Sequence, residues 1–366
     1  MPPSQGNQPP PRRASASPAA TGSEQPEDPS GQPAFCGGCA EGAVEAACRG
    51  GFSRIGAKKV HWECWSDCNL ACGFCYRSRG APLETADAER LLSAIATAGS
   101  RMVVFAGGDP ALRADLVHLV EHARTLRLRT EVHTNAQFAP ERVRRALAQV
   151  DCVGLSLDGP SAAVHDAVRR RPGNFKRVLA LLGWLEQAGV PVIVRTVVAR
   201  PNHTTVADIG ELLVDFDNVV AWYLLEFSPV GLGFDSRAAF ELPRSGFDEA
   251  VRRASLRYGG RLEIHPRREE DKSGAYVMVT PDGYVYGTGA DPVGGRYPRV
   301  GSVLREHLRD LADRVDFRRE RHEPRYDVVD SMLRRKRVQL GRPEEGFSPL
   351  DIRVQFPQKE SSSGLT

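Results

Sequence analysis

The sequence predicts an α/β protein, a partial (β/α)6 barrel followed by a C-terminal α+β extension. Short apolar segments alternate with helix-like segments six times between residues 60 and 228. Apolar strands that alternate with helices favour a parallel sheet with right-handed crossovers. This alternation ends near residue 230, and 41% hydrophobic residues are enough for a sizeable core.

Six apolar segments are the expected barrel strands: Val60–Ser66, Met102–Ala106, Thr130–Thr134, Cys152–Leu157, Val192–Val198 and Val219–Phe227. Thr85 can cap the first helix, and Gly99 ends it. The spacing of apolar residues predicts the later helices near residues 112–126, at Pro140–Val150, from Asn174 to Gly189 and at Thr205–Phe216.

Beyond residue 230 we expect a helix near Ser245–Arg257, a hairpin that turns at Pro281-Asp282-Gly283, and a helix near Val303–Val315. The two ends of the chain are poor in large apolar residues, so we expect them to be disordered. The expected parts are a disordered tail (1–34), a cysteine-containing segment (35–59), the barrel (60–230), the extension (231–340) and a mostly disordered tail (341–366).

Composition narrows the range of partners. The net charge of +3 is too small to indicate nucleic acid or a membrane surface. No run of 18 apolar residues is present, and the N-terminus lacks the apolar region of a secretory signal. We therefore expect a cytoplasmic protein with no nucleic-acid partner and no membrane partner.

Three cysteines directly follow the first predicted strand, in the segment Cys68-Asn69-Leu70-Ala71-Cys72-Gly73-Phe74-Cys75. The loop after a barrel strand is where such folds place their chemistry. Three thiolates at this spacing can ligate three irons of a [4Fe–4S] cluster and leave the fourth iron open. A zinc site is the alternative, with Cys64 or His61 as a fourth ligand.

This segment resembles the CxxxCxxC signature of the radical S-adenosylmethionine (SAM) superfamily, which has an aromatic residue, here Phe74, before the third cysteine. The resemblance covers roughly residues 60–228. It implies a [4Fe–4S] cluster held by Cys68, Cys72 and Cys75, SAM as the second cofactor, and a flavodoxin or ferredoxin as electron donor. In this family SAM is cleaved to a 5′-deoxyadenosyl radical, which abstracts hydrogen from a substrate.

The resemblance also implies SAM contacts. The stretch Gly107-Gly108-Asp109-Pro110 is similar to a family motif, usually Gly-Gly-Glu-Pro, that hydrogen-bonds the SAM ammonium. An Asp-Pro helix start is the alternative for Asp109. The strand ends that face the ribose and carboxylate of SAM in this family carry Asn135, Ser156, Asp158 and Arg195 here. The alternatives are a turn residue for Asn135 and a structural salt bridge for Arg195.

The remaining cysteines allow other roles. Cys36, Cys39, Cys48 and Cys64 form either a second metal site or unligated thiols. Cys152 begins a predicted strand, so we expect a small core residue there. Because no cysteine follows Cys152, the C-terminal auxiliary clusters of many peptide-modifying family members are not expected.

Two later stretches, Trp222–Phe227 and Gly274–Val279, resemble those of viperin-like nucleotide dehydratases and of actinobacterial radical SAM enzymes of nucleoside or sugar antibiotic pathways, such as cytosylglucuronate decarboxylase. The resemblance implies a nucleoside, nucleotide or sugar substrate from natural-product biosynthesis. We expect this polar small molecule to bind near Tyr223 and Glu226. Lyase, dehydratase and oxidoreductase chemistry all remain open.

Four arginines beyond the barrel can neutralise a carboxylate or phosphate of the substrate, or form a solvated basic face: Arg267, Arg268, Arg296 and Arg299. Two other functions stay open. One is maturation of a ribosomal peptide by a radical SAM enzyme. The other is a metal-binding module without catalysis.

Overall fold

The computed structural model describes residues 57–341, in which ten strands form one sheet. Their order is β10-β9-β8-β1-β2-β3-β4-β5-β6-β7, and every pair from β8 to β7 is parallel. The strands are β1 (Lys59–Trp65), β2 (Met102–Gly107), β3 (Arg129–Thr134), β4 (Cys152–Ser156), β5 (Val192–Val198), β6 (Val219–Glu226), β7 (Ile264–Arg267), β8 (Val277–Val279), β9 (Tyr284–Gly287) and β10 (Arg299–Ser302).

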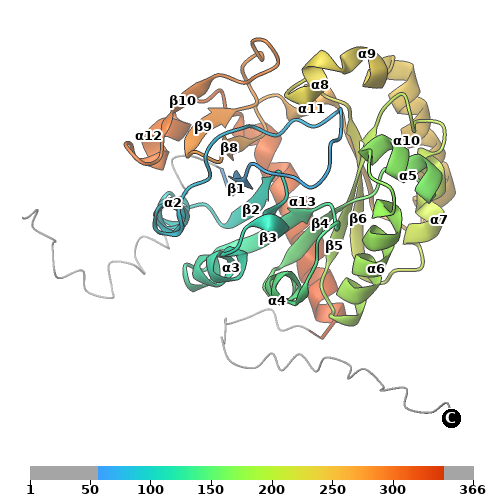
Figure 1. Cartoon of the computed structure of the whole chain (residues 1–366), viewed down its shortest axis with the longest axis horizontal. Coiled ribbons are helices and arrows are strands. Elements are labelled where there is room, and N and C mark those ends of the chain that lie inside the picture. Colours follow the sequence, from blue (N-terminus) through green and yellow to red (C-terminus); the bar gives the residue numbers. More distant parts are fainter. Residues whose placement is uncertain (1–56, 342–366) are drawn as a thin grey trace, which may run out of the picture. The chain divides into compact units, whose positions relative to one another are not determined.

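The sheet is curved, and helices cover its outer face (Figure 1). The covering helices are α2 (Thr85–Thr97), α3 (Leu116–Thr125), α4 (Glu141–Gln149), α5 (Ala162–Arg169), α6 (Asn174–Gln187), α7 (Ile209–Leu213) and α10 (Arg244–Tyr258). The other helical segments are the 3₁₀ turns η1 (Pro110–Leu112) and η2 (Val206–Asp208), and α8 (Leu232–Asp235), α9 (Arg237–Phe240), α11 (Glu269–Lys272), α12 (Leu308–Ala312) and α13 (Arg319–Gln339).

The predicted α/β partial barrel is confirmed, and each end of its six strands lies within one residue of the expectation. Seven α-helices and strands were not predicted: α5, α8, α9, β7, α11, β10 and α13. The helix expected at Thr205–Phe216 is only the turn η2 followed by the short α7. Thr85 does not cap α2, because its hydroxyl donates to Asp115 Oδ2 at 2.8 Å and the N-cap is Glu84. The extension continues the barrel sheet, since β8 pairs with β1 and β7 pairs with β6.

Alternation along β1 separates two environments. Trp62 and Cys64 are fully buried in the core beneath the outer helices. His61 points the other way and lines a cavity on the concave side of the sheet. Burial of a large side chain such as Trp62 contributes about 1.5–3 kcal/mol, so the outer face stabilises the sheet and leaves the concave face available for polar groups.

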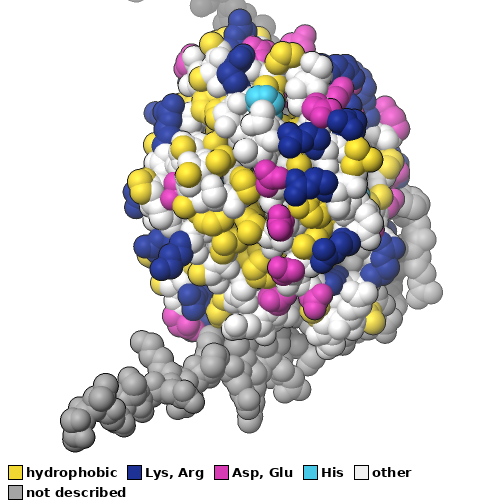
Figure 2. Space-filling model, turned by 90° about the vertical axis from the view of Figure 1, so that its right-hand side faces the viewer, with side chains coloured by type: hydrophobic (Ala, Val, Ile, Leu, Met, Phe, Trp, Pro, Cys, Tyr) yellow, Lys and Arg dark blue, Asp and Glu magenta, His cyan; other side chains and the backbone are white. Residues whose placement is uncertain are grey.

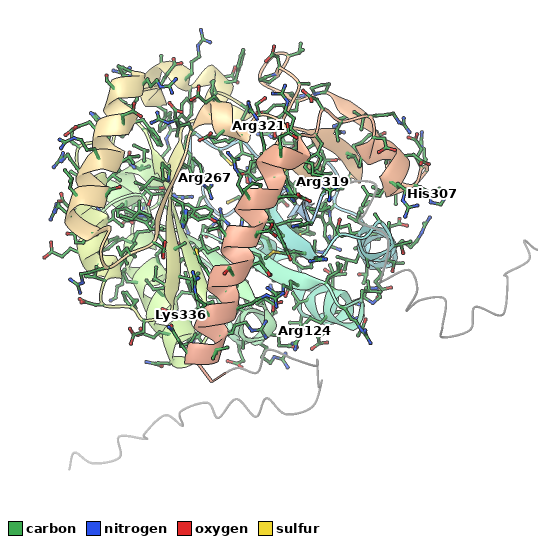
Figure 3. The ribbon with its side chains drawn as sticks, turned by 180° about the vertical axis from the view of Figure 1, so that it is seen from behind. Arg124, Arg267, His307, Arg319, Arg321 and Lys336 are labelled. Carbon is green, nitrogen blue, oxygen red and sulfur yellow. The ribbon has the colours of Figure 1, made fainter. Side chains whose placement is uncertain are left out.

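Helix α13 closes the concave face at the amino ends of the strands (Figure 3). Its apolar residues form one buried cluster with residues from the starts of the strands: Met102, Cys152, Ile193, Val220, Ala221, Tyr223, Tyr326, Val329, Met332 and Leu333. Ion pairs join Arg129 to Asp330 and Arg337 to Asp151. The expectation that Cys152 is a small core residue is confirmed, because its side chain is fully buried in this cluster.

The two tails that we expect to be disordered, and Cys36, Cys39 and Cys48, lie outside the described residues. Within residues 57–341, no helix is both long and apolar enough to span a membrane. On the face shown in Figure 2, basic and acidic side chains are interspersed and do not separate into large areas of one sign.

Candidate active site

The cysteine loop, residues 66–83, crosses the carboxyl ends of the strands (Figure 1). At its base, Ser66 Oγ donates to the carbonyl oxygen of Gly80 at 2.5 Å. On the far side of the barrel the Phe74 ring packs edge-on against Phe240, with centroids 5.6 Å apart. There the N–H of Leu232 also donates to the carbonyl oxygen of Cys75 at 2.8 Å. The loop is therefore fixed at both sides of the barrel mouth.

The glycines that end β2 permit close contact with the base of this loop. A Cβ atom on Gly108 would lie 1.9 Å from the carbonyl oxygen of Asp67, and one on Gly107, whose φ is +115°, would lie 2.3 Å from that of Trp65. The N–H of Gly108 donates to the Trp65 carbonyl at 2.6 Å, and the N–H of Asp109 donates to that of Asp67 at 2.9 Å. We expected these glycines to allow close approach to SAM, and the structure shows that they allow close approach to the cysteine loop.

Cys68, Cys72 and Cys75 all line one cavity of about 290 Å³. Burial raises the pKa of each of the three thiols, and that of Cys75 to about 11. Without a metal the thiols therefore hold their protons at neutral pH. Iron binding must displace those protons, as it does wherever thiolates are the ligands.

Hydrogen-bond donors are directed at two of the sulfurs. The N–H of Leu70 and Nδ2 of Asn135 each lie 3.4 Å from Cys68 Sγ. Nη1 of Arg169 lies 4.0 Å from Cys72 Sγ. Donors in these positions stabilise negative charge on sulfur and tune the potential of an iron–sulfur cluster. The residues present therefore fit a cluster with thiolate ligands.

The zinc alternative fits less well. Within residues 57–341, no three His, Cys, Asp or Glu side chains are grouped closely enough to hold one metal ion. In a [4Fe–4S] cluster each thiolate binds its own iron, so the sulfurs need not converge on one point. Cys64 lies in the core, does not line the cavity, and burial raises its pKa to about 12. His61 lines the cavity but is not grouped with the cysteines as a ligand set.

The carboxylate of Asp109 does not line the cavity, an arrangement that favours its alternative role over the direct SAM contact expected from the sequence. It is fully buried and accepts hydrogen bonds from the N–H of Ala111 (2.9 Å), the hydroxyl of Thr134 (3.1 Å) and the N–H of Asn135 (3.1 Å). Burial raises its pKa to about 6 although these three donors oppose the shift. Asp109 therefore starts the 3₁₀ turn η1, as its alternative predicted, and it positions Asn135 beside Cys68.

Asp158 is also buried and does not line the cavity, an arrangement that favours a positioning role over the SAM contact that the resemblance implies. It forms an ion pair with Arg169 and accepts a hydrogen bond from the N–H of Val197 at 2.8 Å. Arg169 lines the cavity, and its guanidinium lies 5.2 Å from the centre of the Phe74 ring. Burial lowers the pKa of Arg169, but the Asp158 carboxylate and Cys72 outweigh it, so the net shift is upward.

The sequence prediction missed Arg169 because it missed α5, the helix that Arg169 ends. A short amphipathic pattern was available, since the buried residues His165, Val168 and Arg169 are spaced by three and four. Asp158 and Arg169 thus act together: the carboxylate holds the guanidinium next to Cys72.

The other predicted cofactor residues line the same cavity as the cysteines: Phe74, Gly107, Gly108, Asn135, Ser156 and Arg195. Arg195 forms an ion pair with Glu131, as its structural alternative predicted. The proposed substrate residues Tyr223 and Glu226 line this cavity too. The structure thus brings these side chains together, and their contacts with SAM or substrate stay predictions.

Residues 62–213 match the family model described as the Radical SAM superfamily. This region of the chain belongs to the superfamily. The cofactors of radical SAM enzymes are a [4Fe–4S] cluster and SAM, in agreement with the donor set around Cys68, Cys72 and Cys75.

Three known proteins show how far the similarity extends. The AdoMet-dependent heme synthase of Nitratidesulfovibrio vulgaris is 33% identical over 181 residues, 48% of this chain and 49% of that protein. The PqqA peptide cyclase of Rhodopseudomonas palustris is 33% identical over 157 residues, 41% of this chain and 42% of that protein. The chain therefore spans about half the length of the curated relatives it matches. Streptococcus suis SuiB, solved bound to S-adenosylmethionine, shares the fold with a TM-score of 0.57 and 16% identity, over 70% of this chain and 65% of that one.

Proposed function

We propose that this radical SAM enzyme holds its [4Fe–4S] cluster with Cys68, Cys72 and Cys75 and abstracts hydrogen from a polar small molecule. One observation carries the proposal: the three cysteines and six of the eight predicted SAM residues line a single cavity that α13 closes from the opposite end. When bound, the cluster supplies the electron that cleaves SAM to methionine and a 5′-deoxyadenosyl radical. A flavodoxin or ferredoxin is the proposed source of that electron.

The residues of the chain supply position and exclusion of water. Asn135 and Arg169 direct hydrogen bonds at the cysteine sulfurs, and Asp109 and Asp158 hold those two donors in place. Ser156, at the end of β4, offers a hydroxyl to SAM from the wall of the cavity. Because the cysteine loop crosses one end of the barrel and α13 fills the other, a radical formed between them is shielded from water.

The substrate class is supported by the polar side chains on one side of this cavity. Polar side chains from β6 and the segment after it line it, among them Tyr223, Glu226 and Ser228. A substrate must place one C–H bond within near-attack distance of the radical, so it binds between the cysteine loop and these residues. A nucleoside, nucleotide or sugar from natural-product biosynthesis is the class we propose.

Maturation of a ribosomal peptide is the second candidate. The similarity to the PqqA peptide cyclase favours it, although that similarity covers 41% of this chain. A panel of nucleosides, nucleotides, sugar conjugates and peptides separates the two candidates. Turnover of a peptide alone would favour the second one.

The experiment is anaerobic reconstitution followed by incubation with SAM and dithionite. We expect about four irons and four sulfides at this site, as three thiolates and an open iron imply, and formation of 5′-deoxyadenosine. The triple variant Cys68→Ala, Cys72→Ala, Cys75→Ala should lose both. A triple variant that keeps its iron and its activity would contradict the proposal.

Two controls sharpen this experiment. The cysteines at 36, 39 and 48 are first changed to Ser, so that any iron measured belongs to the cysteine loop. The variant Cys64→Ala is then compared with this parent, since Cys64 lies in the core and away from the cavity. It should keep its iron and its 5′-deoxyadenosine formation, whereas zinc ligation by Cys64 would make it lose metal.

A further inference from the structure

The cavity wall is rich in cations. Within the described part of the chain, a single carboxylate side chain, Glu226, lines it. Six basic side chains line it as well: Lys59, Arg169, Arg195, Arg267, Lys272 and Arg325. Lys59 and Arg169 are buried and the other four are partly buried. A cation withdrawn from water needs a partner, so we ask what neutralises each of them.

Four of the six are neutralised by carboxylates behind the wall. The pairs are Lys59 with Glu131 (3.6 Å), Arg195 with Glu131, Arg169 with Asp158, and Lys272 with Glu269 (2.9 Å). Glu131 serves two cations at once, and the Arg195 and Lys59 charges hold its pKa well below the ordinary value although burial opposes them. Three carboxylates, those of Glu131, Asp158 and Glu269, therefore balance the charges of these four cations.

Arg267 has no such partner. It makes no salt bridge within residues 57–341, and its guanidinium lies 4.6 Å from the centre of the Tyr223 ring. Arg195 contacts the same ring at 5.1 Å, so Tyr223 is flanked by two guanidinium groups. Its hydroxyl is buried in a residue that is 5% exposed, and Arg267 is the donor beside it: burial raises the pKa of the phenol, and the Arg267 guanidinium opposes that shift.

Arg325 brings an unpaired donor to this cavity from α13. Its Nη2 lies 3.6 Å from Asp271, but its Nη1 is buried without a hydrogen-bond partner among residues 57–341. Buried donors in folded proteins are nearly always paired, and an unpaired one in a cavity marks a place for a ligand atom. Figure 3 shows Arg267 on the side of the sheet that α13 crosses.

We propose that Arg267, Arg325 and Tyr223 form a binding site for a carboxylate or phosphate group of the substrate. Two guanidinium groups and a phenol hydroxyl provide the forked, charge-assisted donors that such an anion prefers. The inference rests on the proposed function, because it assigns the substrate of that same cavity. The site lies on β6, β7 and α13, whereas the cysteine loop and the predicted SAM contacts lie on β1 to β5.

The test measures binding to the reconstituted holoenzyme by equilibrium dialysis, with radiolabelled succinate and radiolabelled inorganic phosphate as probes. We expect the wild-type protein to bind at least one probe and Arg267→Gln to bind it at least tenfold more weakly. Tyr223→Phe removes only the hydroxyl and should weaken binding by about threefold, the scale of one neutral hydrogen bond. The probe that binds more tightly identifies carboxylate or phosphate as the group recognised.

Arg296→Gln is the matched control, because Arg296 is exposed and does not line the cavity. It should bind the probe as the wild type does. SAM affinity, measured by dialysis on the same samples, should change less than threefold in Arg267→Gln. A tenfold loss of SAM affinity would place Arg267 at the SAM carboxylate and overturn the inference. Equal probe binding by wild type and Arg267→Gln, or no binding of either probe, would overturn it too.

The two proposals fail in different ways. A protein that never cleaves SAM but binds the anion through Arg267 contradicts the radical function and keeps the anion site. A protein that cleaves SAM but does not distinguish Arg267→Gln from wild type keeps the function and loses the site. Each sample is checked by circular dichroism, and Tyr223→Phe carries the test if Arg267→Gln fails to fold.

Discussion

Replacing Asp109 by alanine should destabilise the folded protein strongly and change SAM affinity little. The carboxylate is fully buried and accepts hydrogen bonds from two backbone N–H groups, of Ala111 and Asn135, and from the Thr134 hydroxyl. The hydroxyl can rotate toward another acceptor, whereas the two N–H groups are fixed. Leaving two buried donors unpaired costs about 1–3 kcal/mol each, so we expect the free energy of unfolding to fall by about 2–6 kcal/mol.

Thermal unfolding of the reconstituted protein measures this loss. At about 2–4 °C per kcal/mol for a domain of this size, the Tm should fall by at least about 4 °C. The matched control is Asp87→Ala, which removes an exposed carboxylate paired with Arg90 three residues later. Such a surface pair contributes about 0.3–0.5 kcal/mol, so the Tm of this control should stay within about 2 °C of wild type.

The affinity of Asp109→Ala for SAM tests whether the carboxylate contacts SAM directly. Because the Asp109 carboxylate does not line the cavity, the dissociation constant for SAM should rise less than threefold. Loss of a direct charge-assisted hydrogen bond would instead cost about 1.5–3 kcal/mol, which is roughly 10- to 150-fold. An unchanged Tm together with a tenfold loss of SAM affinity would refute the positioning role and restore the direct contact.

Three further predictions follow from the same geometry. Arg169→Gln removes a donor from a cysteine sulfur and should make the cluster potential more negative, as measured by redox titration, and an unchanged potential would contradict this role. Gly108→Ala should abolish iron incorporation, because its Cβ would lie 1.9 Å from a carbonyl oxygen, whereas Gly183→Ala, with its nearest neighbour at 3.9 Å, should incorporate iron normally. Leu333→Ala should lower the free energy of unfolding, measured by urea titration, by about 2–5 kcal/mol. The control Leu256→Ala, at an exposed position, should lower it by less than about 0.5 kcal/mol. Equal losses in the two variants would show that α13 does not close the barrel.

The barrel strands could be predicted because their signal is local. A run such as Val192–Val198 is buried along most of its length, so its apolar β-branched residues alone mark the strand. The Cys68–Cys75 segment could be predicted equally well, because the spacing of its cysteines and its position after a strand are both visible in consecutive residues.

Helix α13 could not be predicted in the same way. It contains Pro324 and is polar over most of its length, with its buried residues near the middle, such as Tyr326 and Val329. Its stability comes from packing into the concave face and from ion pairs with the starts of distant strands, for example Arg129 with Asp330. Tyr326, Val329 and Leu333 are spaced by three and four as in a helix, but these few apolar residues stand among many charged ones, so the pattern is weak.

The orientation of a carboxylate is a further quantity that the sequence does not contain. Asp109 and Asp158 stand at strand ends that line the cavity, which is why SAM contacts were expected of them. Backbone geometry turns both side chains away, toward Asn135 and Arg169, and those two residues reach the cysteines. The motif indicated the two carboxylates, whereas the side chains that reach the cysteine sulfurs are their partners, Asn135 and Arg169.

One part of the cavity is lined by residues inside the region that matches the family, and the other part by residues beyond it. This is why the family could be recognised from the sequence and the substrate could not. The matched region ends at residue 213, and it includes the cysteine loop and every predicted SAM contact. Tyr223, Arg267 and Arg325, which line the rest of the cavity, all lie beyond it. Similarity over the first part is therefore enough to identify the cofactors. We therefore expect substrate choice to depend on the later part, where Arg267, which makes no salt bridge within residues 57–341, lies against the buried Tyr223.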